Sequence, residues 1–213
     1  MSASVGGAAG RTDHALERLV FFSDAVFAIA ITLLIIEIRV PHLAKGSPDI
    51  AYWAELVKLI PSLWGWLISF AVIGFFWMGH HRAFAMTAHY SSRILGWNMA
   101  FLAVMAFMPF VTAFMAQNRN EGVPSIVYCA TLLLAALLNI RVVRMATSPP
   151  MVDAGADPAT IRYARGRGIA VAAGAATALG LAFFFPTFAQ IALASIGLWQ
   201  RLLVKRPADS PLA

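Results

Sequence analysis

Charged residues and cysteine are both scarce in this sequence of 213 residues. The single cysteine, Cys129, lies in an apolar run and excludes an intrachain disulfide, so we interpret it as a small packing residue. Charged residues make up 12% of the chain, against about 25% in soluble domains. So low a charged fraction excludes an ordinary soluble globular protein, which would expose large apolar patches and aggregate.

Apolar residues, in contrast, make up 60% of the chain, against roughly 45–50% in soluble domains. A bilayer removes the difficulty, because lipid solvates apolar faces. The formal net charge of +6 would suggest a nucleic-acid partner in a soluble protein, but here the basic residues lie between apolar runs. We therefore expect a multi-pass protein of the cell membrane, with no nucleic-acid partner and no bound cofactor or metal.

Six apolar segments are candidates for membrane spans, each of which needs roughly 20 mostly apolar residues. The predicted fold class is therefore all-α, a bundle of six helices within a transmembrane domain of residues 14–206. The last two segments form nearly one run, which as a single helix would be about 58 Å long. Phe185-Pro186-Thr187 predicts a tight turn between them. Residues 1–13 are expected to be disordered, residues 207–213 to form a tail, and the spans to cover about 18–38, 59–79, 94–116, 124–144, 166–184 and 187–204.

The placement of basic residues predicts the orientation of these spans. Twelve of the 16 lysines and arginines flank span ends that share one side of the membrane. The positive-inside rule assigns that side to the cytoplasm, and both termini lie on it. Residues 145–161 then form a polar cytoplasmic loop, and residues 41–51 and 117–124 form external loops.

Asp24 is a carboxylate within or at the edge of the first apolar run. One interpretation makes Ser23 and Asp24 the N-cap of the helix, but only about 14 residues then remain before Glu37, which is short for a span. If the helix begins earlier, near residues 13–15, Asp24 lies inside it and needs a partner. Arg18 is six residues away and therefore on a different side of the helix. Groups on other spans are further candidates: His80, His81 and Asn98.

Ile29, Leu33 and Ile36 follow one another at spacings of four and three residues, so they share one helix face. Periodicity alone would make this stripe a packing or lipid-facing surface, which any apolar helix offers. Thr32 can bond the carbonyl of Ala28 within the helix, so its hydroxyl does not by itself indicate an ion site.

The motif Arg18-x-x-x-Phe22-Ser23-Asp24 resembles the signature of the transmembrane protein 175 family of potassium channels. The Ala-Val-Phe-Ala-Ile-Ala-Ile-Thr-Leu-Leu that follows it is similar to the bacterial branch. The resemblance covers the first three spans well and the last three mainly by hydropathy. It continues in Phe76-Trp77-Met78-Gly79-His80-His81-Arg82, in Trp97-Asn98 and in Met108-Pro109-Phe110-Val111-Thr112.

This resemblance implies a homotetramer in which four copies of the first helix line a central pore. It implies a constriction made of apolar side chains, in place of the Thr-Val-Gly-Tyr-Gly carbonyl filter that this chain lacks. By position the constriction falls on Ile29, with Leu33 and Ile36 following toward the outside. The signature residues are expected to join a buried polar network that braces the helices: Arg18, Ser23 and Asp24, which we extend to His80, His81 and Asn98.

The expected function is a leak-like ion channel, modestly selective for potassium over sodium, with a hydrophobic gate in the first helix. Its partners are further copies of the chain, the lipid bilayer and potassium ions, and we do not expect an enzyme. A proton-coupled secondary transporter that uses Asp24 and the His80/His81 pair is the alternative. An intramembrane metalloenzyme with His80, His81 and Asp24 as metal ligands is disfavoured, because the adjacent His80 and His81 would point about 100° apart on a helix. A structural membrane protein without transport stays open.

Overall fold

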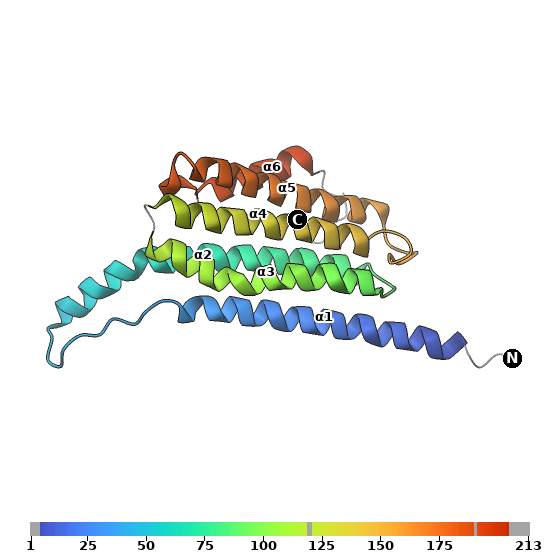
Figure 1. Cartoon of the computed structure of the whole chain (residues 1–213), viewed down its shortest axis with the longest axis horizontal. Coiled ribbons are helices and arrows are strands. Elements are labelled where there is room, and N and C mark those ends of the chain that lie inside the picture. The colour runs from blue at the N-terminus through green and yellow to red at the C-terminus, as the bar shows by residue number, and fades with distance from the viewer. Residues whose placement is uncertain (1–4, 119–120, 190, 205–213) are drawn as a thin grey trace.

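The computed structural model describes residues 5–118, 121–189 and 191–204. Within them, Figure 1 shows the long helices side by side in a bundle, with α1 along one edge and α5 and α6 along the opposite edge. The predicted all-α membrane bundle of six helices is confirmed. The elements are α1 (Val5–Ile36), α2 (Asp49–Ala85), α3 (Ser92–Gln117), α4 (Gly122–Ala146), α5 (Pro158–Ala182), the 3₁₀ helices η1 (Pro186–Phe188) and η2 (Ile191–Ala194), and α6 (Ser195–Leu203).

Four helices of the described chain are long and apolar enough to cross a membrane: α1 from His14 onward, α2, α3 and α4. α5 has 25 residues but is rich in alanine and glycine, which makes it less apolar. The last segment differs from the single helix expected over residues 187–204, because it is divided into η1, η2 and the nine-residue α6. Pro186 opens η1, where the sequence predicted a turn.

α1 begins at Val5, earlier than the sequence predicted. Residues 5–13 are therefore helical, whereas their composition had suggested a disordered terminus. Residues 1–4 and the predicted tail of residues 207–213 lie outside the described residues. Because the helix runs through Ser23 and Asp24, these residues are not its N-cap, and Asp24 lies well inside the helix.

Pro61 lies inside α2. A proline removes one backbone hydrogen bond and clashes with the preceding turn, so it bends a helix. Figure 1 shows the first turns of α2 inclined away from the bundle, while the rest of the helix runs alongside α3. All buried residues of α2 follow this proline, so the part after Pro61 is the part that packs.

The loop between α4 and α5 folds back onto the end of α2. The Ala88 amide donates to the Met151 carbonyl at 2.8 Å, and the Asp153 amide donates to the Met86 carbonyl at the same distance. Arg165 on α5 donates to the carbonyl of Thr147 at 2.7 Å. These bonds satisfy backbone groups that the helix ends leave free, and they fix the loop expected over residues 145–161 against the bundle.

Asp157 caps the start of α5. Its carboxylate accepts hydrogen bonds from the amides of Ala159 and Thr160, at 3.1 and 2.8 Å. These bonds, with the Ala159 amide first, hold the pKa of Asp157 below its usual value. Pro158 follows at the first helical position. An amide hydrogen there would have no acceptor within the helix, so proline's lack of one loses no hydrogen bond.

Two glycines on α5 allow close contact with neighbouring helices. A methyl group added at Gly168 would lie 3.2 Å from Cγ1 of Ile140 on α4. One added at Gly174 would overlap the side chain of Ile196 on α6 and lie 3.1 Å from its backbone. Small residues of this kind let membrane helices approach each other, since lipid provides no hydrophobic driving force for their association.

We predict that Gly174→Ala destabilises the protein by about 1–3 kcal/mol, because the added methyl group forces α6 away from α5. The thermal midpoint of the detergent-solubilised protein should fall by several degrees. Gly180→Ala is the matched control, because nothing lies within 4 Å of a methyl group added there. Equal midpoints for the two variants would show that α6 does not depend on close approach at Gly174.

Candidate functional site

One face of α1 is buried against α2 and α3. Its buried side chains recur every three or four positions, as the helical period of 3.6 residues requires. They are Leu19, Ser23, Phe27, Ala30 and Leu34. This pattern defines the rotation of α1 about its own axis and therefore which side chains face away from the bundle.

The predicted apolar stripe lies on a different face of α1 and is exposed. Ile29 is 57% exposed, Leu33 40% and Ile36 71%. Thr32 donates its hydroxyl to the carbonyl of Ile29 at 2.9 Å, not to that of Ala28 as predicted, so its hydroxyl is nonetheless bonded within the helix. A protomer thus presents a row of large apolar side chains that its own helices do not cover.

A chain of side-chain hydrogen bonds joins α1 to α3 and α2. Asn98 on α3 donates from Nδ2 to Ser23 Oγ on α1 at 2.9 Å. His80 on α2 lies with Nε2 2.8 Å from Asn98 Oδ1, and because that oxygen can only accept, Nε2 is the donor. The Ser23 hydroxyl donates a hydrogen bond to the carbonyl of Leu19 at 2.8 Å. Three of the predicted network residues are therefore in direct contact, and all three are buried.

His80 is surrounded by aromatic rings. Its ring stacks on Phe84, with centroids 4.4 Å apart, and meets the edge of Phe27 at 5.6 Å. Phe101 lies on a further side at 6.1 Å. The second ring nitrogen, Nδ1, is buried without a hydrogen-bond partner among the described residues. The imidazole therefore acts here as a packed ring with one directed bond, which fixes Asn98.

Asp24 has a partner that the sequence did not single out. Its Oδ1 accepts a hydrogen bond from Nε1 of Trp77 on α2 at 2.8 Å. The Trp77 ring in turn stacks on His81, with centroids 5.6 Å apart. Asp24 and His81 are thus linked through the Trp77 indole. The indole cannot relay a proton between them, because its single N–H donates to Asp24 and it has no acceptor.

Arg18 is the predicted network residue that stands apart. Its side chain is exposed, and none of the hydrogen bonds or ion pairs among the described residues joins it to Asp24. A turn of 100° per residue puts Arg18 on the same side of α1 as Ile29 and Ile36, and Asp24 about 120° away from Arg18. The two ends of the signature therefore face different surroundings within one protomer.

A second buried polar cluster was missed by the sequence analysis. Thr112 on α3 donates to Ser69 Oγ on α2 at 2.9 Å, and Ser69 Oγ lies 3.0 Å from the hydroxyl of Tyr128 on α4. All three residues are buried. Hydroxyl residues inside apolar spans were the available signal, but such a residue can also bond its own helix, so the sequence does not distinguish the two cases.

Comparisons with known proteins identify the family to which this chain is similar. A family model described as the endosomal/lysosomal potassium channel TMEM175 matches residues 18–109. A potassium channel of Streptomyces collinus is 36% identical over 191 residues, which cover 85% of this chain and 87% of the relative. A potassium channel of Chamaesiphon minutus is 38% identical over 127 residues, or 58% of this chain, and the match spans 62% of that relative's length.

A solved structure shares the fold. The crystal structure of a lysosomal potassium-selective channel TMEM175 homolog from Chamaesiphon minutus superposes with a TM-score of 0.75 at 27% identity. The match covers 89% of this chain and 98% of that one. Together these matches identify a helical membrane protein of the ion-channel class rather than an enzyme. Within that class, the chain belongs to the TMEM175 family of potassium channels.

We predict that Asn98→Leu lowers the free energy of unfolding by about 1–2 kcal/mol, because it leaves the buried His80 Nε2 without an acceptor. Thermal unfolding of the detergent-solubilised protein measures the change. Asn118→Leu is the control, since the Asn118 side chain is exposed and, among the described residues, bonds only the carbonyl of Phe114. The bracing role of Asn98 is excluded if both variants unfold at the same temperature.

Proposed function

We propose that four copies of this chain form a potassium channel in which α1 of each copy lines a central pore. The supporting observation is the division of α1 into a buried face that contains Ser23 and an exposed stripe of Ile29, Leu33 and Ile36. A stripe this apolar needs either lipid or further copies of itself against it. The two bacterial relatives named potassium channels favour the second arrangement.

The proposed topology has six spans with both termini in the cytoplasm. The four long apolar helices would provide the first four, α5 the fifth, and the segment from η1 to α6 the last. Residues 191–203 extend about 20 Å as a helix, which is less than the hydrocarbon thickness of about 30 Å. The last crossing therefore needs η1 and the neighbouring surface of α5 to complete it. A cell-membrane location follows from this topology.

In the proposed pore, four Ile29 side chains form the narrowest ring, followed outward by Leu33 and Ile36. Such a ring offers no oxygen ligands to an ion. It excludes hydrated ions when narrow, because the neck loses its water, and passes them when wider. Selectivity for potassium over sodium would then be modest, since it rests on the lower dehydration cost of potassium, and the channel would behave as a leak.

The polar residues would hold α1 in position around this pore. Ser23, Asn98 and His80 act within one protomer, and the bond from Trp77 holds Asp24 against α2. Arg18 lies on the side of α1 that faces away from its own bundle. We therefore assign Arg18 and Asp24 to bracing between neighbouring copies, with His81 supporting Trp77.

The first test is ion flux through the purified protein in liposomes, with Ile29→Asn as the variant. Wild-type protein should pass potassium faster than sodium without a proton gradient. Ile29→Asn should raise the conductance severalfold and reduce the potassium-to-sodium permeability ratio, because an amide hydrates the neck. Bilayer recordings of single channels measure both quantities.

Ile35→Asn is the matched control, because Ile35 is also exposed on α1 but lies about 120° from Ile29. A pore elsewhere is indicated if Ile29→Asn behaves as wild type. Saturating flux that requires a proton gradient would instead support the secondary transporter.

The second test concerns Asp24 and assembly. Asp24→Ala should reduce the fraction of tetramer in detergent, while the surviving channels keep the wild-type permeability ratio. Multi-angle light scattering measures the assembly. Trp77→Phe is the control, since it removes only the bond within the protomer. A tetrameric Asp24→Ala protein with altered ion preference would contradict this assignment.

A further inference from the structure

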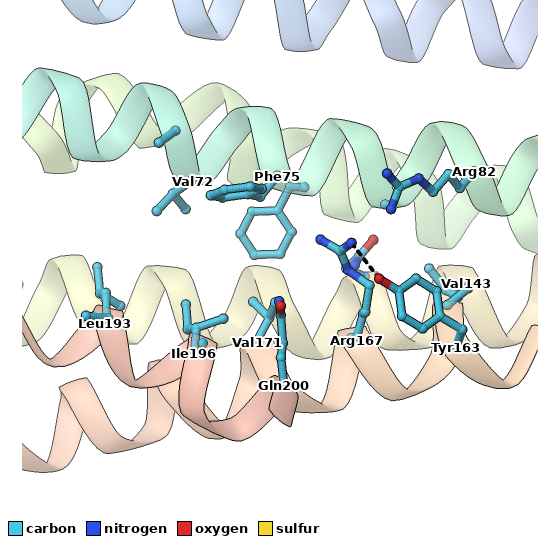
Figure 2. A pocket seen from close by; sticks show the side chains of 18 of the residues that line it. Val72, Phe75, Arg82, Val143, Tyr163, Arg167, Val171, Leu193, Ile196 and Gln200 are labelled. Atoms are coloured by element: carbon cyan, nitrogen blue, oxygen red, sulfur yellow. Dashed lines mark hydrogen bonds between the residues drawn. The ribbon is translucent and has the colours of Figure 1, made fainter. Parts of the chain in front are cut away.

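A cavity of about 400 Å³ lies on the far side of α2 from α1, between α2, α4, α5 and α6. Its volume is within the range of protein ligand sites, roughly 300–1,000 Å³. Figure 2 shows Val72 and Phe75 of α2 on one side, facing Leu193, Ile196 and Val171 on the other. This part of the cavity is lined by hydrocarbon.

The other end of the cavity is cationic. Arg82 from the last turn of α2 and Arg167 from α5 both line it, and Figure 2 shows their side chains at the same end, reaching toward each other from facing helices. Arg167 stacks over the Tyr163 ring at 5.7 Å and donates to its hydroxyl at 3.4 Å. Neither guanidinium pairs with a carboxylate within the described part of the chain.

Arg165, which lies on α5 like Arg167, is in contrast an arginine with a structural role. It donates at 2.9 and 2.7 Å to the hydroxyl and carbonyl of Thr147, and also to Ser148, so its bonding capacity is used within the protein. Arg82 makes no such bond among the described residues, and Arg167 makes only the long one to Tyr163. Two partly buried cations therefore face the cavity, and apart from the long bond to Tyr163 their donors have no partner among the described residues.

A further polar atom at the cavity lacks a partner. Asn139 on α4 lines the cavity and is buried, and its Oδ1 has no hydrogen-bond donor among the described residues. A buried acceptor without a donor is costly, unless a ligand or water supplies one. A headgroup that carries hydroxyls as well as negative charge would satisfy Asn139 and the two arginines together.

The length of the cavity fits one lipid leaflet. From Ile68 to Arg82 its α2 wall covers 15 residues and rises about 21 Å, which is close to half of the roughly 40–45 Å that a bilayer spans with its headgroups. The cationic end lies where α2 ends and α5 begins, beside the basic loops. Basic pockets between membrane helices at this level bind anionic lipid headgroups.

We infer that this cavity binds an anionic phospholipid, with its acyl chain along Val72 and Phe75 and its headgroup between Arg82 and Arg167. A zwitterionic lipid such as phosphatidylcholine brings its own cation beside its phosphate, so the two guanidinium groups would gain no net counter-charge in a partly dehydrated site. A free phosphate would leave the apolar part of the cavity without an occupant. The site is separate from the stripe of α1, so it does not depend on the proposed pore.

The test is lipid binding to the full-length protein in detergent, measured by native mass spectrometry with phosphatidylglycerol and, in parallel, phosphatidylcholine. Wild-type protein should retain phosphatidylglycerol preferentially. Arg82→Gln combined with Arg167→Gln should weaken its binding by about tenfold or more, because two charge contacts are lost. Arg93→Gln combined with Arg144→Gln is the charge-matched control, since both residues line a different surface cavity.

A second pair of variants tests the acyl-chain part without changing charge. Gly197 lines the cavity, and a methyl group added there meets nothing within 4 Å, so Gly197→Leu should fill space without displacing the backbone. It should lower phosphatidylglycerol binding, whereas Gly180→Leu, at an equally open position outside the cavity, should not.

Three results would overturn the inference. The first is equal binding of both lipids by the wild-type protein. The second is a loss of binding in the control arginine pair as large as in the cavity pair. The third is complete displacement of the lipid by glycerol 3-phosphate, which has no acyl chains. The last result would identify an anion site in place of a lipid site.

Discussion

The rotation of α1 about its own axis decides which of its side chains face away from the bundle, and Ser23 is the residue that fixes it. A change of one residue in register turns a helix by 100°, which would bring Asp24 toward Asn98 and turn Ser23 away from it. The bonds from Asn98 to Ser23 and from His80 to Asn98 hold only in the observed rotation, because they are directional. The exposure of Ile29, Leu33 and Ile36 is a consequence of that rotation.

Hydrogen bonds can have this role because the surroundings are apolar on every side. In a bilayer an apolar side chain gains little by leaving lipid for a protein interior, so shape and polar contacts decide how helices associate. The bundle uses both. Ser69, Thr112 and Tyr128 join α2, α3 and α4 through hydroxyl groups, and Gly174 lets α6 approach α5. No single helix is held by apolar burial alone.

The fold class could be predicted from the sequence because composition and basic loops depend only on the chain. The orientation of α1 could not, because its apolar residues surround the helix and no periodicity separates the buried face from the exposed one. The partner of Asp24 also escaped prediction. Trp77 is 53 residues away, and its indole reaches the carboxylate only because α2 crosses α1 at that level. The division of the last segment at η2 has no equivalent signal, since residues 187–204 are mostly apolar and contain no proline or other helix-breaking pattern at that point.

α2 contributes residues both to the polar contacts that hold α1 and to the cavity between α2, α4, α5 and α6. His80 and Trp77 lie on the side of α2 that holds α1, whereas Phe75 and Arg82 lie on the opposite side and line the cavity. A ligand in the cavity and the buried face of α1 therefore contact α2 from two directions. Occupancy of the cavity influences α1 only if the ligand binds two positions of α2 with different affinity. The rings of Phe27, Phe84 and Phe101 pack around His80, and this close packing opposes small shifts of α1 relative to α2.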